Sequence, residues 1–204
     1  MSADYERAKQ YALDRLASEL SPWLTYHSLR HTRDDVLPAA IRLAHEAGVA
    51  DDARLCLATA ALYHDIGFLY TYEEHEAQGI VVARAVLPGF DYSAEQLATI
   101  VELIAATKMP QRPTSPLAEL LCDADLDVLG REDFWPINRQ LLDETQHYQG
   151  RCIDEAEWLE GQTRFLAEHH FFSPAARRLR DSGKQRNLAK MQYALAALNG
   201  VAHQ

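Results

Sequence analysis

Helical spacing of the apolar residues is the feature that most constrains the fold of this chain. Nearly every long segment places apolar side chains three and four residues apart, and runs of alternating β-branched residues are missing. The first pattern is typical of amphipathic helices, whereas strands would require the second. We therefore expect an all-α protein, built as a multi-helix bundle.

Capping residues, prolines and glycines predict where these helices begin and end. Ser93 followed by Gln96 forms a capping box, and Gly67 is expected to end the helix that carries the most apolar segment. Ser115-Pro116 and Ser173-Pro174 each predict an N-cap followed by the first residue of a helix. The expected helices cover residues 3–20, 31–48, 51–67, 72–86, 94–108 and 116–130.

The C-terminal third continues as amphipathic helices, with no break in composition that would mark a linker. We therefore expect residues 1–204 to form a single domain, in which the helices of residues 136–204 pack on the rest.

Composition and charge exclude several classes of protein. Of the 204 residues, 48% are hydrophobic and 25% are charged, as in folded proteins and unlike disordered chains. A formal net charge of −10 disfavours binding of a nucleic-acid backbone. The charged N-terminal segment predicts no secretory signal, and no window approaches the roughly 18 apolar residues of a membrane span. We expect neither a nucleic-acid partner nor a membrane partner.

Cysteine usage points to the compartment. Cys56, Cys122 and Cys152 are odd in number, widely spaced and placed inside apolar segments. This pattern indicates reduced core thiols, not a disulfide framework or a zinc cluster. We therefore expect a cytoplasmic protein.

An ionisable pair, His64 and Asp65, follows directly after the apolar residues 55–62. Burying such groups is costly unless something compensates them. Adjacent side chains on a helix diverge by about 100°, so these two converge on one point only if the helix ends there. A helix C-terminus carries partial negative charge, and the pair would fit a metal cation at that position. By itself, such a dipeptide is more commonly a hydrogen-bonded structural pair than a metal site.

Two other segments carry further candidate ligands. His27 and His31 stand four residues apart in TYHSLRHTRDDV, and imidazole together with carboxylate suits first-row divalent metals. The segment CDADLDVLG crowds Asp123, Asp125 and Asp127 into an otherwise apolar helix. Asp125 points about 160° away from the other two, so all three cannot bind one ion directly. Helix geometry alone does not decide between the two faces.

The ordered set His31, His64-Asp65 and Asp125 resembles the H…HD…D signature of the HD domain superfamily of metal-dependent phosphohydrolases. The resemblance covers roughly residues 25–130. It implies an all-α core in which these side chains, from separate helices, surround one or two divalent ions. In the family's DAD element the second aspartate is the ligand, and this implies that Asp125 is the fourth ligand. Asp123 and Asp127 would then either support the ligands from outside or lie on a helix face.

The resemblance also suggests proton donors. TYHSLRHTRDDV is similar to the Y-H-x-x-x-H-x-x-x-D-V element of the cyclic-nucleotide phosphodiesterases, in which the earlier histidine protonates the leaving oxygen. This likeness implies that His27 is a general acid, a role suited to a histidine. The alternative is a histidine that only packs against or orients His31.

His75 lies where many HD proteins have a histidine that contacts a second metal or a substrate phosphate. Members with two metals usually add a histidine before the last aspartate, but the equivalent helix here reads IAATKMP. We therefore expect a single divalent ion, whose identity among Mn, Mg, Fe, Co, Ni and Zn stays open.

Two cations are candidates for binding a substrate phosphate. Lys108 and, in the proline-rich segment KMPQRPTSP, Arg112 could hold a phosphate near the metal, or could lie on a solvated loop. The candidate bases, which the sequence does not rank, are Glu73, Glu74 and Glu76. The histidines interpreted as surface or core residues are His45, His147, His169, His170 and His203. The basic run 177–190 is interpreted as a solvated helix face, with contact to a nucleotide or a partner subunit as the alternative.

These residues together imply a hydrolytic reaction. A divalent ion held by two histidines and two aspartates leaves positions for water and for a phosphate oxygen. Asp65 or Asp125 could accept a proton from the water, and His27 or His75 could donate one to the leaving group. We expect a phosphohydrolase acting on a phosphate ester or anhydride, with a nucleotide as the small-molecule substrate. The alternative is a catalytically weak HD protein that acts as a nucleotide sensor or interaction module. A homodimer stays open.

Overall fold

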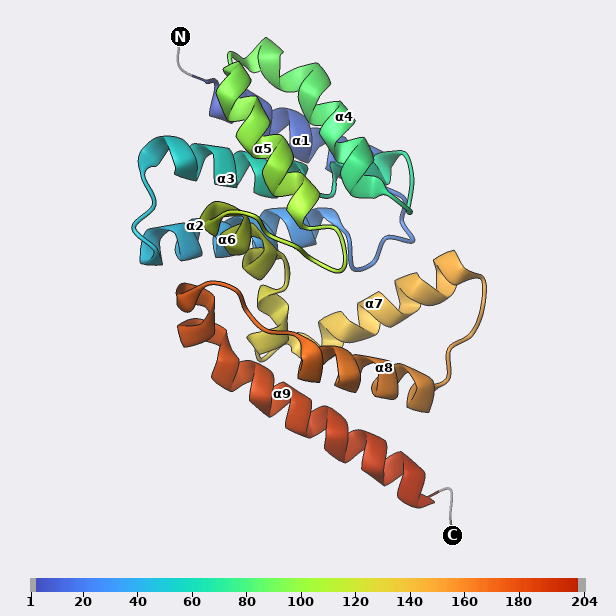
Figure 1. Cartoon of the computed structure of the whole chain (residues 1–204). Helices are drawn as coiled ribbons and strands as arrows, with labels where there is room; N and C mark the ends of the chain where they lie inside the picture. Colours follow the sequence, from blue (N-terminus) through green and yellow to red (C-terminus); the bar gives the residue numbers. More distant parts are fainter. Residues whose placement is uncertain (1–2, 202–204) are drawn as a thin grey trace.

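Residues 3–201 are described by a computed structural model (Figure 1), and within this range the chain is helical with no β-strand. The predicted all-α fold class is confirmed. In chain order the α-helices are α1 (Tyr5–Glu19), α2 (Leu37–Glu46), α3 (Asp51–Tyr63), α4 (His75–Val86), α5 (Ala94–Ala106), α6 (Pro116–Asp125), α7 (Phe134–Gln149), α8 (Glu155–Glu168) and α9 (Pro174–Val201). Four short turns of π or 3₁₀ helix join them: η1 (His31–Val36), η2 (Ile66–Leu69), η3 (Leu87–Phe90) and η4 (Asp127–Gly130). His203 lies outside the described residues.

Local capping explains several helix starts. Ser93 Oγ accepts the Gln96 backbone N–H at 3.1 Å, and Gln96 Oε1 accepts the Ser93 N–H at 2.9 Å, so the predicted capping box is formed. Ser115 and Ser173 cap α6 and α9 in the same way, by accepting backbone N–H groups at 3.2 Å and 3.1 Å. The sequence therefore predicted these three starts for the correct physical reason.

Gly67 acts differently from the prediction. The third helix ends at Tyr63, four residues earlier, and Gly67 lies within the 3₁₀ turn η2. A Cβ at this glycine would lie 1.8 Å from the carbonyl oxygen of His75. The residue is therefore a point of close backbone approach that lets the start of α4 pack against η2, and not a helix stop.

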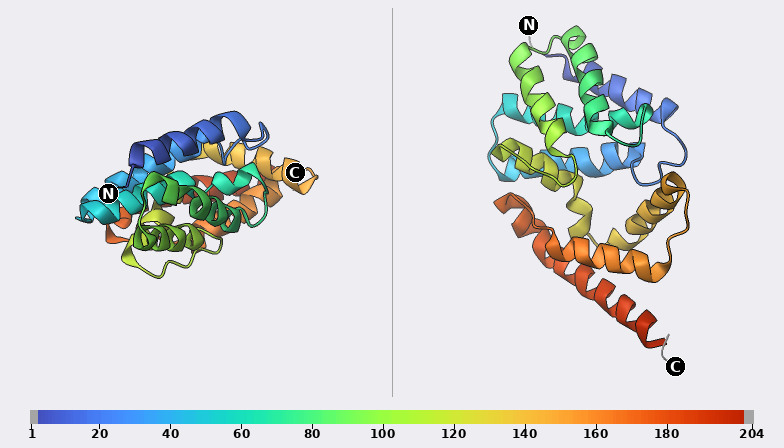
Figure 2. Two further views of the ribbon diagram at one scale, coloured as in Figure 1. Left: turned by 90° about the horizontal axis from the view of Figure 1, so that it is seen from above. Right: turned by 45° about the vertical axis from the view of Figure 1, so that its right-hand side comes forward.

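Helix α3 forms the centre of the core. It contacts α1, α2, α5 and α6, and Figure 2 shows it enclosed by these neighbours. Leu57, Leu62 and Tyr63 are fully buried, and the Tyr63 hydroxyl donates to the carbonyl of Ala8 at 2.9 Å. Full burial of one leucine side chain stabilises the folded state by about 1.5–3 kcal/mol, so these buried residues hold the C-terminal end of α3 inside the core. The end of α3 is thereby held deep in the protein.

The C-terminal helices pack on one side of this core. α8 contacts α9, and α9 also contacts η4, α2 and α6, while the last turns of α9 extend away from the other helices (Figures 1 and 2). Gly130 and Gly183 face each other so closely that a Cβ on Gly183 would lie 1.9 Å from the Gly130 carbonyl oxygen. Two facing glycines therefore let α9 lie directly on η4. The division into a 25–130 core and a 136–204 extension stays a prediction.

Two further expectations can be compared with the structure. Cys56 and Cys122 are buried as expected, but Cys152 is exposed because it lies in the loop between α7 and α8. In the part of the chain that the structure describes, no helix has both the length and the apolar character needed to cross a membrane.

Candidate metal centre

His64 and Asp65 follow the last residue of α3, where the chain leaves the α-helix. His64 Nδ1 lies 2.9 Å from the Ala61 carbonyl oxygen, which fixes the ring with Nε2 on the opposite side. Asp65 has left helical geometry, with φ −100° and ψ 1°, so its carboxylate turns to the side of the imidazole. His64 Nε2 and Asp65 Oδ2 are 3.2 Å apart. The helix therefore ends at the position where His64 and Asp65 can approach one point, as predicted.

His31 reaches the same point from η1. In this π-helical turn the Leu37 N–H donates to the Thr32 carbonyl, five residues earlier. Pro38 follows directly and has no N–H to donate. His31 Nε2 lies 3.6 Å from Asp65 Oδ2. Ligand atoms of His31, His64 and Asp65 all lie within 4.8 Å of one another, which is close enough to share one ion.

Asp125 completes the cluster from the last residue of α6. Its Oδ1 lies 3.2 Å from His31 Nε2 and 3.5 Å from His64 Nε2. On the other oxygen, Gln111 Nε2 donates to Asp125 Oδ2 at 3.1 Å, which orients the carboxylate. The structure therefore brings together all four residues that the sequence predicted as ligands. Gln111 was not identified from the sequence.

The donor set fits a divalent cation. His31, His64 and Asp65 are 5%, 1% and 4% exposed, and His64 Nε2 and Asp65 Oδ2 have no hydrogen-bond partner among the described residues. Buried polar atoms without partners are costly, and two imidazole nitrogens with two carboxylate oxygens suit first-row divalent metals. The two unpartnered atoms lie 3.2 Å apart, a separation that suits two neighbouring ligands of one ion.

Electrostatics within the cluster are strongly coupled. Burial alone would raise the pKa of Asp65, but the adjacent His64 outweighs it and holds that pKa well below its usual range. Burial would likewise raise the pKa of Asp125, and the adjacent imidazoles of His31 and His64 lower it. Burial would lower the pKa of His64, yet the two carboxylates raise it well above its ordinary value. Protons and a metal ion therefore compete for the same imidazole nitrogens.

The other two aspartates of the CDADLDVLG segment have different partners. Asp123 accepts the backbone N–H groups of Phe172 and Ser173, both at 2.7 Å. Asp127 accepts a two-pronged bond from Arg180, at 2.7 Å and 2.8 Å, and a third bond from Arg42. Both tie the C-terminal helices to the core. The helix predicted over residues 116–130 ends earlier, at Asp125, and Asp127 lies in the 3₁₀ turn η4, so continuous-helix spacing applies to Asp123 and Asp125 alone.

His27 lies beside the cluster and is held by a carboxylate that the sequence analysis missed. Its Nδ1 lies 2.5 Å from Glu144 Oε1, while Glu144 Oε2 accepts the backbone N–H groups of Tyr26 and His27 at 2.8 Å and 3.0 Å. Glu144 is fully buried. Its spacing from Ile137 and Leu141 places it on the apolar face of α7, and this was the available signal.

The environment of His27 favours the protonated ring. Burial lowers the pKa of His27, but the hydrogen bond to Glu144 and the nearby Asp65 more than compensate, and the net pKa is raised. The side chain is 21% exposed and stacks on Phe68 with 4.5 Å between ring centroids. A partly exposed, protonated imidazole beside the cluster can donate a proton.

His75 opens α4 and also borders the cluster. Its Nε2 lies 3.6 Å from Asp65 Oδ1 and 3.4 Å from Glu76 Oε1, and its ring stacks on Phe68 at 3.8 Å. Of the three candidate bases, Glu76 is buried next to His75, whereas Glu73 and Glu74 are exposed. Proximity thus favours Glu76 over the other two.

The two candidate phosphate-binding cations lie on the surface. Lys108 forms an ion pair with the exposed Glu74. Arg112 is exposed in the loop between α5 and α6 and makes no ion pair within the described residues. Their phosphate-binding roles stay predictions.

The remaining histidines and the basic run differ in their surroundings. His45, His147 and His170 are exposed, and neither ring nitrogen of the half-buried His169 has a partner within residues 3–201. The basic run is not purely solvated, because Arg180 pairs with Asp127 and the buried Lys184 donates to the His169 carbonyl.

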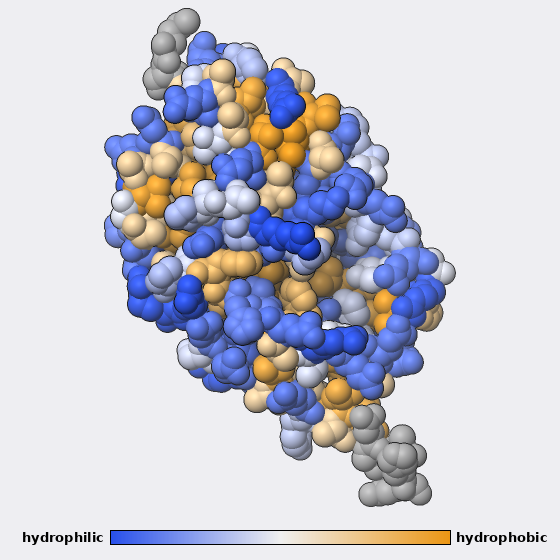
Figure 3. All heavy atoms as spheres, viewed as in Figure 1, coloured by the Kyte–Doolittle hydropathy of each residue, from blue (hydrophilic) through white to orange (hydrophobic). Residues whose placement is uncertain are grey.

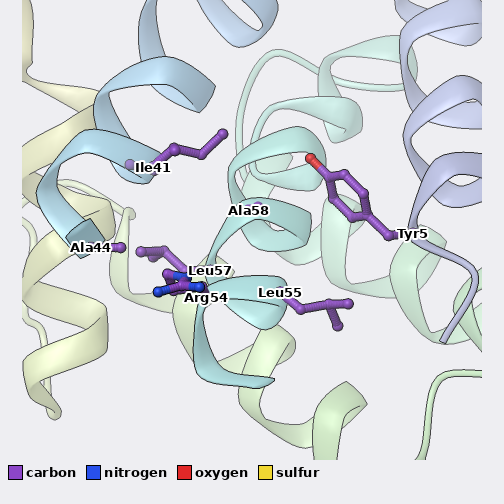
Figure 4. Close-up of a pocket in the computed structure, with 8 residues that line it drawn as sticks. Tyr5, Ile41, Ala44, Arg54, Leu55, Leu57 and Ala58 are labelled. Carbon is purple, nitrogen blue, oxygen red and sulfur yellow. The ribbon is translucent and has the colours of Figure 1, made fainter. Parts of the chain in front are cut away.

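A cavity of about 260 Å³ adjoins the cluster, because His27 and Asp125 are among the residues that line it. Figure 3 shows apolar surface in a hollow near the middle of this face, where α7 and α8 approach the loop after α5. A second pocket, of about 250 Å³, lies among Tyr5, Ile41 and Leu55 at the junction of α1, α2 and α3 (Figure 4). It shares no lining residue with the first and contains no predicted site residue, so the first is the relevant one.

Comparison with known proteins agrees with this geometry. A family model described as the HD domain matches residues 15–127, which include all four predicted ligands. Searches of curated proteins and of solved structures gave no match. The matched residues make up more than half of the chain and nearly coincide with the 25–130 core expected from the motifs. The chain therefore belongs to the HD domain family, a family of metal-dependent phosphohydrolases.

Proposed function

We propose that this protein is a metal-dependent phosphohydrolase that cleaves a phosphate ester or anhydride, with a nucleotide as the substrate. One observation carries the proposal: buried, unpartnered atoms of His64 and Asp65 lie within 4.8 Å of a ligand atom of His31, and Asp125 Oδ1 lies 3.2 Å from His31 Nε2. Such an arrangement is costly for stability unless a cation compensates it. Membership of the HD domain family supports the same function.

His31, His64, Asp65 and Asp125 would hold the ion. When bound, a divalent cation supplies Lewis-acid chemistry, because it polarises a phosphoryl oxygen and lowers the pKa of water. Gln111 keeps Asp125 in place through its 3.1 Å hydrogen bond. Asp65 is the proposed proton acceptor, because His64 and His75 flank its two oxygens and its carboxylate stays ionised beside His64.

The leaving group needs a proton, and His27 is the proposed donor. Water forms a new P–O bond while the bond from phosphorus to the leaving oxygen breaks, so one proton is lost by water and one is gained by the leaving oxygen. Glu144 fixes the His27 ring at Nδ1 and raises the pKa of the imidazole, which favours the protonated form. Nε2 is then the atom from which the proton is donated. His75, which stacks on the same phenylalanine, is the second candidate donor.

The nucleotide part of the proposal is supported by the likeness of the His27 segment to the phosphodiesterase element. Lys108 and Arg112 are the cations proposed to approach a substrate phosphate. Lys108 would have to exchange its exposed partner Glu74 for the substrate, at little cost, because exposed ion pairs contribute only about 0–1 kcal/mol.

The test is a phosphatase assay of the purified chain with manganese, magnesium, cobalt or nickel. The substrates are nucleoside mono-, di- and triphosphates, cyclic nucleotides and a model phosphodiester. Asp65→Ala should abolish turnover, whereas Asp143→Ala, the same change on an exposed position of α7, should retain it. Metal binding without turnover of any substrate would contradict the proposal and favour a nucleotide sensor.

A further inference from the structure

The cavity beside the candidate metal centre contains residues that the proposed reaction does not use. His27 and Asp125 line it on the side of the centre. Most of its other lining residues belong to η4, α7 and α8, beyond the residues 15–127 that match the HD domain. A cavity that continues from a reaction centre into chain-specific helices is placed to bind the part of the substrate that does not react.

The lining of this cavity selects against charge. Tyr26, Phe134 and Phe165 contribute aromatic rings, and most of the other side chains are aliphatic. Among the described lining residues none is a lysine or arginine, and Asp125 is the sole acid. Away from His27, which borders the metal centre, a second phosphate or a carboxylate would therefore be desolvated without a cationic partner, at a high cost. An uncharged organic group fits.

Two amide side chains supply a directed polar contact. The Trp158 indole N–H donates to Asn138 Oδ1 at 2.8 Å, and Asn138 Nδ2 donates to Gln162 Oε1 at 2.6 Å. Because an indole N–H can only donate, it fixes the orientation of both amides. Gln162 Nε2 is left as a donor that bonds to no described residue. Gln162 lines the cavity, so its Nε2 can donate a hydrogen bond to an acceptor on a bound group.

Volume limits the size of the group. An apolar cavity of about 150 Å³ holds benzene, which corresponds to about 25 Å³ for each non-hydrogen atom. On that scale a cavity of about 260 Å³ holds about ten non-hydrogen atoms. One substituted ring or one nucleobase has this size, whereas a complete nucleoside is too large.

We infer that this cavity binds the organic group of the phosphate substrate, and that the group is an uncharged ring system whose acceptor receives a hydrogen bond from Gln162. The inference rests on the proposed phosphohydrolase function, because only that function makes the bound group part of a substrate. The preference for an uncharged acceptor rests on the cavity alone. A nucleobase is one member of this class.

The test compares two small phenols that differ in the acceptor. 4-Hydroxyacetophenone carries a carbonyl where 4-ethylphenol carries a methylene, and both fit the cavity volume. Isothermal titration of the metal-free protein should give a dissociation constant roughly three- to tenfold lower for the ketone than for 4-ethylphenol. This ratio corresponds to the free energy of one hydrogen bond. Gln162→Leu should abolish or reverse the preference, because the ethyl compound is the more apolar.

Two further variants secure the interpretation. Gln162→Glu keeps the side-chain shape but removes the donor, so it should also lose the preference. Gln149→Leu makes the same change as Gln162→Leu at an exposed position of α7 and should keep it. Far-UV circular dichroism checks that each variant is folded. Equal affinities in the unmodified protein, or an unchanged preference in both Gln162 variants, would overturn the inference.

A second measurement links the cavity to the substrate. 4-Hydroxyacetophenone should compete with 4-nitrophenyl phosphate in the metal-loaded enzyme, raising KM and leaving kcat unchanged. Binding without competition would overturn the substrate role of the cavity while leaving the phosphohydrolase proposal intact. If no metal supports hydrolysis of any phosphate compound, the proposed function fails and the substrate role fails with it. The binding comparison would still decide whether the cavity selects an acceptor.

Discussion

Glu144→Gln probes the carboxylate that joins α7 to the His27 segment. Glu144 accepts three hydrogen bonds, two from backbone N–H groups and one at the His27 ring. A hydrogen bond to a charged group contributes about 1.5–3 kcal/mol and a neutral one about 0.5–1.5 kcal/mol. The amide oxygen can keep the two backbone bonds in neutral form, so the free energy of unfolding should fall by about 1–3 kcal/mol.

Complete removal of the side chain should cost more. Glu144→Ala leaves two buried N–H groups without an acceptor, each worth about 1–3 kcal/mol, so a loss of about 3–5 kcal/mol is expected. The assay is urea unfolding of the metal-free protein, followed by far-UV circular dichroism. Glu160→Gln, the same change at an exposed position of α8, is the control and should shift the free energy by less than about 0.5 kcal/mol.

The pH dependence separates the ring contact from the backbone contacts. The pKa of His27 is raised in the folded state, mainly by Glu144 against the effect of burial. Its stabilising contribution is therefore complete below the unfolded pKa of about 6.5 and is lost as the pH rises through the folded pKa. The difference between the unmodified protein and Glu144→Gln should be larger at about pH 6 than at about pH 9. An equal difference at both values would refute the role of the His27 contact.

Three other perturbations have definite expected outcomes. Asp123→Ala removes the carboxylate that caps the chain before α9 at Ser173, so urea unfolding should show a loss of about 2–4 kcal/mol with metal content unchanged; loss of metal instead would contradict the assignment. Gly67→Ala places a Cβ against the His75 carbonyl and should lower the thermal midpoint sharply; a midpoint within a degree of the original would contradict the close approach. Burial lowers the pKa of His169 to about 4, so stability should fall as the pH drops from about 6.5 to 4, and His169→Gln should remove that part of the pH profile. Parallel pH profiles of the unmodified protein and His169→Gln would contradict this role of His169.

Local signals made much of the fold predictable. Ser93, Ser115 and Ser173 act through bonds to residues three positions away, and such contacts are written in adjacent sequence. Apolar spacing sets the helices for the same reason. The candidate ligands were found although they lie on separate helices, because their order and local contexts match the HD motif. The resemblance singled out Asp125 from the aspartate trio, whereas the continuous helix assumed for all three aspartates ends at Asp125.

Contacts between distant segments could not be predicted. Glu144 meets His27 across 117 positions, and although its spacing on the apolar face of α7 indicates burial, no local pattern indicates its partner. Gln111 lies in a loop, where no periodicity places its side chain near Asp125. Gly67 was interpreted as a helix stop because a stop and a close backbone approach both require the absence of a Cβ. The cavity depends on α7 and α8, whose packing the sequence does not specify.

Metal content tests the central claim most directly. The protein is saturated with manganese, dialysed and analysed by inductively coupled plasma mass spectrometry, beside the variants Asp65→Ala, Asp125→Ala and Asp123→Ala. A single ion per chain is expected in the unmodified protein and in Asp123→Ala. Asp65→Ala and Asp125→Ala should lose the ion while keeping their helical circular dichroism. Retention of the ion by Asp65→Ala and Asp125→Ala, or its absence from the unmodified protein, would contradict the metal centre.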